Sequence, residues 1–201
     1  MIKNVVFDIG NVIWRGRTSI ILDKISLTDQ QKEEIKNTFF SNTKPLDMGE
    51  ETLEEHFYKY PSSITNDKEI KEFLINYYKY RDFNLRIIEL IHKLKENNYN
   101  VYILSNNNKE AMEYLKQAPE LQGLDGWIVS CYYGVMKPEK EIYEILFEKF
   151  NIKPEESFFI DDSEKNINAA AALGMEGYIL KGDEEGIDGL INYMRMYKVN
   201  V

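Results

Sequence analysis

Short apolar runs punctuate the chain, and amphipathic segments lie between the later ones. Their length and their Val, Ile and Phe content are typical of strands buried on both faces of a sheet. The predicted strands are residues 4–7, 100–104, 127–130, 157–160 and 177–180. Residues 86–97 and 139–150 place apolar side chains at helical spacing. Strands that alternate with helices predict an α/β fold with a Rossmann-like parallel sheet core in three layers.

The stretch from residue 17 to residue 82 breaks this alternation. It has no strand-like run, and its helical patterns are separated by turn-forming residues at 42–45 and 60–63. We interpret it as an inserted helical cap, with residues 1–16 and 83–201 forming the core. The many aromatic residues of the stretch are expected to form the cap's own apolar interior rather than a ligand cage.

Charge and length limit the partners of the chain. Its 201 residues include 25 Lys and Arg against 34 Asp and Glu, a formal net charge of −9. Sequence-independent binding of nucleic acid needs a basic face, so we predict no nucleic-acid partner. No run approaches the ~18 apolar residues of a membrane span, and no signal peptide precedes the first predicted strand, so we expect no membrane partner.

Cysteine and histidine are scarce. Cys131 is the single cysteine, which excludes an intramolecular disulfide and suits a reducing compartment, so we predict a cytoplasmic protein. His56 and His92 have no cysteine or second histidine at metal-ligand spacing, which argues against a zinc site. We therefore expect acid chemistry to come from carboxylates.

Polar residues follow the predicted strands at the edge where a doubly wound sheet binds ligands. They are Asp8, Ser105, Asn106, Lys137, Asp161 and Asp162. Asp8 and Asp162 offer the hard oxygen ligands that Mg²⁺ prefers, and a carboxylate can attack phosphorus once a cation offsets the repulsion between anions. Lys137 and Ser105 would hold other phosphoryl oxygens. The pattern predicts Mg²⁺ as cofactor and a small phosphorylated metabolite as ligand.

Some of these residues also have a purely structural explanation. Ser105 and Asn106 precede a helical pattern and would serve as its N-cap, a role that can coexist with phosphate binding. The two adjacent acids would in the same way cap the helix that follows them. Asn11 is expected to ease a backbone turn. Trp14 either lines the pocket or packs at the base of the cap.

Four ordered motifs resemble those of the haloacid dehalogenase superfamily and together cover essentially the whole chain. They are residues 5–12 (VVFDIGNV), 101–106 (VYILSN), 134–138 (GVMKP) and 158–163 (FFIDDS). The Asp-x-Gly-Asn-Val opening looks closest to the small sugar-phosphate phosphatases related to alpha-D-glucose-1-phosphate phosphatase. The resemblance implies a Mg²⁺-dependent phosphatase that hydrolyses a small phosphomonoester, such as a sugar phosphate, through an aspartyl-phosphate.

The resemblance also implies a role for each matched residue. These are catalysis by Asp8, the nucleophile, and Lys137; substrate binding by Ser105, Asn106 and Lys137; and metal ligation by Asp8, the Gly10 carbonyl, Asp162 and its neighbour Asp161.

One position departs from the family pattern. Most phosphatases of the superfamily carry a second aspartate two positions after the nucleophile, as acid and base, and this chain has Gly10 there. Loss of a general acid and base typically costs ~10²- to 10⁴-fold in rate. The enzyme would then be slow, suited to a good leaving group such as an anomeric sugar phosphate, or reliant on another acid. Asp47 and His56 of the predicted cap are the donors we consider, and the sequence selects neither.

Two alternative functions remain open at this level. A haloacid dehalogenase shares the fold and nucleophile but needs no metal, and the pair Asp161–Asp162 argues against it, because extra carboxylates beside an anionic substrate only repel it. A phosphate-binding or regulatory protein with weak turnover is the second alternative, and Gly10 is the feature that motivates it.

Overall fold

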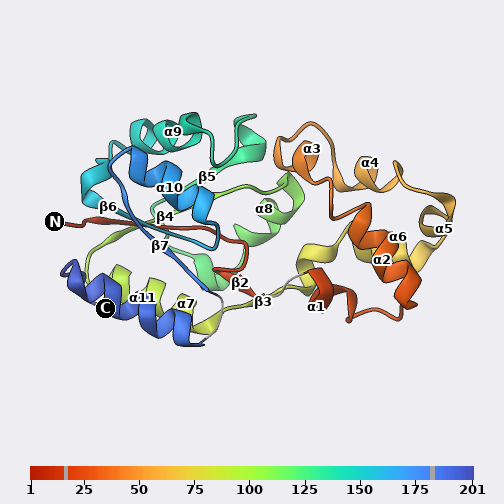
Figure 1. The fold of residues 1–201 in the computed structure, drawn as a ribbon, viewed down its shortest axis with the longest axis horizontal. Coiled ribbons are helices and arrows are strands. Elements are labelled where there is room, and N and C mark those ends of the chain that lie inside the picture. Colours follow the sequence, from red (N-terminus) through yellow and green to blue (C-terminus); the bar gives the residue numbers. More distant parts are fainter. Residues whose placement is uncertain (16–17, 182–183) are drawn as a thin grey trace.

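The computed structural model describes residues 1–15, 18–181 and 184–201. Its centre is a parallel sheet of five strands in the order β5-β4-β1-β6-β7 (Figure 1). The strands are β1 (Asn4–Phe7), β4 (Asn100–Ser105), β5 (Gly126–Val129), β6 (Ser157–Asp161) and β7 (Glu176–Ile179). Each predicted strand is confirmed, with ends that differ by one residue at most.

Helices cover both faces of the sheet. They are α7 (Leu85–Glu96) and α11 (Glu184–Met196) on one face, α9 (Lys140–Phe150) and α10 (Glu164–Ala172) on the other, and α8 (Lys109–Leu115) beyond β4. Successive strand residues point to opposite faces. Val5 and Phe7 accordingly belong to the apolar cluster that includes α7 and α11, whereas Val6 belongs to the cluster with α9 and α10. The predicted three-layer α/β fold is confirmed.

Residues 18–80 form a group of short helices to the right of the sheet in Figure 1, which we call the helical segment. It comprises α1 (Thr18–Leu22), α2 (Asp29–Asn37), α3 (Lys44–Asp47), α4 (Leu53–Phe57), α5 (Ser62–Thr65), α6 (Lys68–Leu74) and the 3-10 helix η1 (Tyr77–Tyr80). Thr28 and Thr52 begin α2 and α4 with capping boxes, which satisfy backbone N–H groups that these helices leave unpaired. The rings of Phe39, Phe40 and Tyr77 pack edge to face inside the segment.

A two-stranded antiparallel ribbon connects the helical segment to the sheet. Its strands are β2 (Trp14–Arg15) and β3 (Asp82–Phe83). The ribbon could not be predicted from the sequence, because strands of two residues are too short to show an alternation of apolar and polar side chains. The predicted boundary after residue 82 falls inside β3, and the boundary between residues 16 and 17 lies outside the described residues. The division into core and cap therefore stays a prediction.

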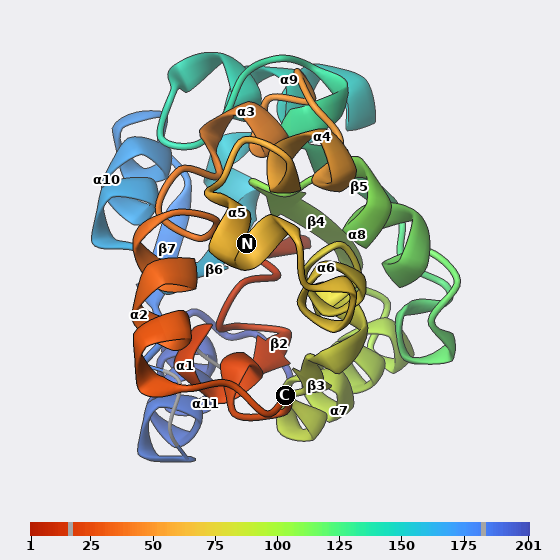
Figure 2. The same ribbon diagram turned by 90° about the vertical axis from the view of Figure 1, so that its right-hand side faces the viewer.

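The carboxyl ends of the five strands point toward the helical segment, which lies in front of them in Figure 2. Parallel pairing with β1 at the centre brings the ends of β1, β4 and β6 side by side, with Phe7 opposite Ile103 and Ile160. The first residue after β1 and the last residues of β4 and β6 therefore meet at one edge. Within the described residues, no helix has both the length and the apolar content that crossing a membrane requires.

Gly49, in the helical segment, packs tightly against the backbone of Cys131, which follows β5. Its φ is +73°, and a Cβ atom there would lie 2.2 Å from the carbonyl oxygen of Cys131. Gly123 has a similar φ of +81° but no heavy atom within 4 Å of the same position. We expect Gly49→Ala to lower the free energy of unfolding by about 2–4 kcal/mol, because backbone strain and overpacking add.

Gly123→Ala serves as the matched control, because it introduces the strain alone. It should cost about 1–2 kcal/mol. Urea denaturation of both variants measures the difference, and equal losses would show that the contact with Cys131 does not constrain position 49.

Candidate active site

Three carboxylates converge at the edge where β1 and β6 end. Asp8 directly follows β1, Asp161 is the last residue of β6, and Asp162 comes next. One oxygen from each lies within 4.8 Å of the others. Asp8 and Asp161 are buried, whereas Asp162 is exposed. Like charges this close repel one another, and a nearby cation or a bound proton reduces that repulsion.

Lys137 supplies one such cation. Its Nζ donates to Asp8 Oδ1 at 2.8 Å, to Asp161 Oδ2 at 2.6 Å and to the Leu104 carbonyl oxygen at 2.9 Å. The side chain is almost fully buried, so all three of its donors are satisfied by protein atoms. Burial alone lowers the pKa of Lys137, but the charges of Asp8 and Asp161 outweigh it and raise the pKa above its usual value.

The backbone of Lys137 is also fixed by hydrogen bonds. Asn106 Nδ2 donates to the Lys137 carbonyl oxygen at 2.9 Å, and Asn106 Oδ1 accepts from the Lys137 N–H at 2.8 Å. The amide of Asn106 therefore clips the loop that carries Lys137 to the end of β4. This arrangement favours a positioning role for Asn106, and direct substrate binding by its side chain stays a prediction.

Asp161 is surrounded by hydrogen-bond donors. Besides Lys137, its oxygens accept from the Ser163 N–H at 2.8 Å and from Asn166 Nδ2 at 3.0 Å. Asn166 lies in the first turn of α10 and belongs to none of the sequence motifs, so the sequence did not single it out. These bonds use both oxygens of Asp161 to fix Lys137 and the start of α10. Metal ligation by Asp161 stays a prediction.

Asp162 and Gly10 lie on the open side of the cluster. Asp162 Oδ2 accepts from Asn11 Nδ2 at 2.8 Å, which ties the turn after β1 to the turn after β6. Asn11 has a φ of +56°, so it takes the left-handed turn conformation expected of it. A Cβ atom at Gly10 would meet only Asp8 Oδ2, at 3.6 Å, which is ordinary contact.

Ser105 presents a buried hydroxyl without a partner. Its side chain is 1% exposed, and its Oγ makes no hydrogen bond to the described part of the chain. The N-cap of α8 is Asn108, whose side chain accepts from the Ala111 N–H at 2.9 Å, so the capping explanation for Ser105 and Asn106 is wrong. An unpaired buried hydroxyl is costly unless a ligand satisfies it.

Burial dominates the electrostatics of Asp8. It raises the pKa of Asp8 to about 6, against the lowering effect of Lys137, and Asp161 raises it further. A bound divalent cation would add positive charge beside this carboxylate and favour its ionised form.

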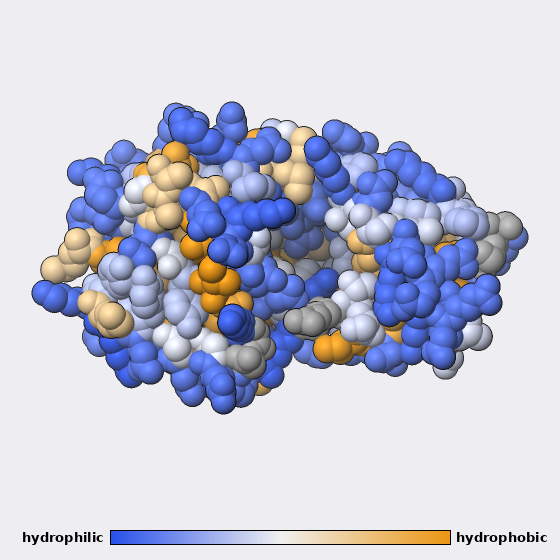
Figure 3. Space-filling model, viewed as in Figure 1, coloured by the Kyte–Doolittle hydropathy of each residue, from blue (hydrophilic) through white to orange (hydrophobic). Residues whose placement is uncertain are grey.

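A cavity of about 240 Å³ opens beside Gly10, between the sheet edge and the helical segment. Its lining comes from both parts of the chain: Gly10, Trp14, Thr18, Phe40, Thr43, Asp47, Tyr77, Arg81, Asn106 and Asn107. Figure 3 shows a mostly hydrophilic surface with a hollow where the two parts meet. Trp14 both lines the cavity and packs in the ribbon, so its two expected roles coexist. Asn107 belongs to the polar run that follows β4, whereas Arg81 belongs to no motif and could not be singled out from the sequence.

The two candidate acids of the helical segment have different surroundings. Asp47 lines the cavity together with Gly10. His56 is fully buried, with hydrogen bonds to Glu51, the Phe39 carbonyl oxygen and Tyr60. Burial lowers the pKa of His56, which favours its neutral form. His56 is thus an interior residue of the helical segment and is not among the described residues that line the cavity.

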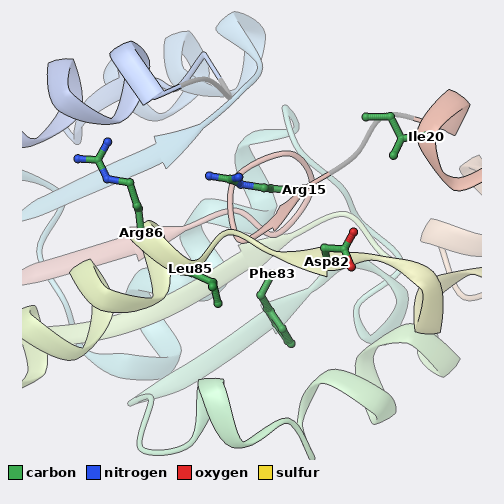
Figure 4. Close-up of a pocket in the computed structure, with 6 residues that line it drawn as sticks. All are labelled: Arg15, Ile20, Asp82, Phe83, Leu85 and Arg86. Carbon is green, nitrogen blue, oxygen red and sulfur yellow. The ribbon is translucent and has the colours of Figure 1, made fainter.

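A second cavity, of about 380 Å³, lies beside the β2–β3 ribbon (Figure 4). Two arginines from its lining, Arg15 and Arg86, both pair with Glu184, at 2.8 Å each. The two guanidinium groups are therefore engaged with α11, and we regard the cavity beside Gly10 as the better candidate for the active site.

Comparison with known proteins places this geometry in a family. The profile of the haloacid dehalogenase-like hydrolases matches residues 2–174. The chain is 28% identical over 192 residues to a D-ribitol-5-phosphate phosphatase of Bacteroides thetaiotaomicron, a match that covers 89% of this chain and 91% of that protein.

Solved structures extend the comparison. A haloacid dehalogenase family enzyme of Bacteroides thetaiotaomicron, in complex with magnesium and inorganic phosphate, aligns with a TM-score of 0.69 at 26% identity, covering 92% of this chain and 96% of that one. An L-2-haloacid dehalogenase of Xanthobacter autotrophicus shares the fold, with a TM-score of 0.68 at 16% identity over 96% of this chain and 83% of that one. The chain therefore belongs to the haloacid dehalogenase-like hydrolase family.

Proposed function

We propose that the chain is a Mg²⁺-dependent phosphatase that hydrolyses a small phosphomonoester through an aspartyl-phosphate on Asp8. The observation that carries the proposal is the convergence of Asp8, Lys137 and Asp162 at one edge of the sheet, beside a cavity. Asp8 is bound by the Lys137 ammonium group, and one of its oxygens lies within 4.8 Å of an oxygen of Asp162. This arrangement suits attack on a phosphoryl group better than binding alone, because a nucleophile is included.

The donor set fits Mg²⁺. Carboxylate and carbonyl oxygens are its preferred protein ligands, and a bound phosphate usually completes its coordination. Asp8 and Asp162 each keep one oxygen that accepts no hydrogen bond from another side chain of the described residues, whereas both oxygens of Asp161 are engaged. We therefore propose Asp8, Asp162 and the Gly10 carbonyl as ligands. Bound Mg²⁺ would offset the negative charge shared by the phosphate and the carboxylates.

The chain's own residues prepare the attack. Lys137 fixes Asp8 through Oδ1 and leaves Oδ2 on the side of Gly10. The unsatisfied hydroxyl of Ser105 is available to a phosphoryl oxygen. Attack of the Asp8 carboxylate on phosphorus would form the acyl phosphate and release the alcohol. Water would then attack this phosphorus, return Asp8 to its free form and release inorganic phosphate.

The substrate is proposed to be a sugar or polyol phosphate. A cavity of about 240 Å³ lies below the ~300–1,000 Å³ typical of drug-sized ligands, so it suits a small metabolite. Hydroxyl, amide and guanidinium groups line it along with aromatic rings, which suits a ligand with several hydroxyl groups. The relative described as a D-ribitol-5-phosphate phosphatase supports the same substrate class.

The cellular setting is part of the proposal. The acidic balance of the chain supports the absence of a nucleic-acid partner. The single cysteine, Cys131, cannot form an intramolecular disulfide, which supports a reducing compartment such as the cytoplasm.

A haloacid dehalogenase is the alternative within the family, and it needs no metal. The exposed carboxylate of Asp162, beside two other acids, favours the phosphatase, because without a cation it would repel the carboxylate of a haloacid. Release of chloride from 2-chloropropionate without added metal would favour the dehalogenase instead.

We expect the parent protein to release phosphate from a panel that includes D-ribitol-5-phosphate, hexose phosphates and p-nitrophenyl phosphate, only when Mg²⁺ is present. Asp8→Asn should abolish release, because an amide oxygen is a poor nucleophile. A malachite-green assay measures the phosphate, and EDTA-treated protein is the control. Undiminished activity in Asp8→Asn would refute the mechanism.

Removal of the Lys137 charge should leave Asp8 and Asp161 buried without their partner. We expect Lys137→Met to abolish phosphate release and to lower the free energy of unfolding by about 3–5 kcal/mol. The matched control is Lys140→Met, which breaks an exposed pair with Glu144 and should cost at most about 0.5 kcal/mol. Equal stability of the two variants, by urea denaturation, would contradict the role of Lys137.

A further inference from the structure

The reaction needs a proton donor and acceptor that Gly10 cannot provide. An alkoxide leaving group must be protonated as it departs, and the water that hydrolyses the acyl phosphate must lose a proton. We propose that Asp47, in the helical segment, is the general acid and base, acting from the cavity that opens beside Gly10. This inference rests on the phosphatase function proposed above.

The position of Asp47 supports this role. It is the last residue of α3 and lines the same cavity as Gly10, Asn106 and Asn107. Thr43 Oγ1 donates to Asp47 Oδ2 at 3.1 Å, which orients the carboxyl group. The other oxygen, Oδ1, accepts no hydrogen bond from the described residues and is available to a ligand. The contact of Gly49 with Cys131 fixes the chain just after α3 against the sheet half.

The protonation of Asp47 suits the two steps. Burial raises the pKa of Asp47 to about 6, Thr43 opposes this, and the charge of Asp8 raises it further. His56 and Lys137 act in the lowering direction. A carboxyl group with a pKa near neutrality can both give and take a proton.

Other titratable groups near the cavity are poorer candidates. Tyr77 lines it, but burial raises its pKa to about 12 and its hydroxyl accepts from Asn108 Nδ2 at 3.0 Å. Cys131, from the 3-10 helix that packs on α3, also has a raised pKa. Arg81 lines the cavity as a cation and has no proton to exchange near neutrality. Among the described lining residues, Asp47 is the one carboxylic acid.

The proton balance closes over one turnover. As the Asp8 oxygen bonds to phosphorus, the bond from phosphorus to the leaving oxygen breaks, and that oxygen takes the proton of Asp47. Water then attacks the acyl phosphate and gives a proton to the Asp47 carboxylate. The bond between phosphorus and Asp8 breaks, inorganic phosphate leaves, and Asp47 is again protonated.

The decisive variant is Asp47→Asn, which keeps the shape and the hydrogen bond from Thr43. With p-nitrophenyl phosphate, whose leaving group needs no proton, the variant should show a burst of one nitrophenolate per active site. A steady state ~10²- to 10⁴-fold slower than the parent should follow, because water lacks a base. With D-ribitol-5-phosphate no burst should form, because alkoxide departure is blocked too.

Glu50→Gln is the matched control, since it removes one exposed carboxylate close to Asp47 in sequence and should behave as the parent. Turnover by Asp47→Asn within threefold of the parent, without a burst, would overturn the inference. Inactive parent protein would instead overturn the proposed function and this inference together. A burst that persists when Asp8→Asn is combined with Asp47→Asn would refute Asp8 as the nucleophile and leave the effect of Asp47 separately measurable.

A second test moves the carboxyl group. Position 10 has room for a Cβ atom, and its backbone is not in the left-handed region, so Gly10→Asp can place an acid beside Asp8. We expect the double variant Gly10→Asp, Asp47→Asn to have a steady-state rate at least tenfold higher than that of Asp47→Asn alone. No recovery in a double variant with the parent's circular dichroism and Mg²⁺ affinity would count against an acid–base role.

The pH profile provides a readout that a structural role would not affect. Because Asp47 must be protonated to assist alkoxide departure, the parent's rate of alkyl phosphate cleavage should fall as the pH rises through about 6. Release of the first p-nitrophenolate by the parent protein should lack this fall, because this leaving group needs no proton. Asp47→Glu, which keeps the carboxyl group, should retain the fall at a shifted pH. A parent protein whose rate of alkyl phosphate cleavage does not fall would overturn the inference.

Discussion

A single buried ammonium group organises the sheet edge of this protein. Lys137 donates three hydrogen bonds, to the carboxylates that follow β1 and end β6 and to a carbonyl of β4. Three neighbouring strands are thereby tied at their tips by one charge. Two buried carboxylates would be unstable side by side without it, and a lysine would be unstable there without them. The energetic dependence is therefore mutual. Two further hydrogen bonds, between the Asn106 amide and the backbone of Lys137, hold the loop that carries the lysine.

The charged groups of the site differ in how deeply they are buried. Asp161 and Lys137 lie deepest, Asp8 lies between them and the surface, and Asp162 is exposed. The inner charges are satisfied by protein atoms, whereas Asp8 Oδ2, Asp162 Oδ1 and Ser105 Oγ keep capacity for partners from outside. A phosphate and its cation would thus meet preorganised groups and need little rearrangement of the inner ones.

Much of this could be predicted from sequence, because it depends on periodicity and topology. Continuous apolar runs define the strands, and parallel strands end at one edge, so Asp8, Ser105 and Asp161 had to meet. The partners of each side chain could not be predicted in the same way. A bond from Lys137 to a carboxylate of the site could be expected, but the order of residues does not say that Asp161 also binds Asn166, or that Asn108 and not Ser105 caps α8. The choice between Asp47 and His56 likewise depends on tertiary packing, which turns one toward the cavity and encloses the other.

The β2–β3 ribbon has a consequence for how such a protein can diversify. Its pairing of Trp14 with Phe83 and of Arg15 with Asp82 places the entry and the exit of the helical segment next to each other. A segment with adjacent ends can be lengthened, shortened or exchanged as a module, since the flanking backbone need not move. Substrate selectivity could then evolve in the module while the ancestral chemistry of the strand tips stays unchanged.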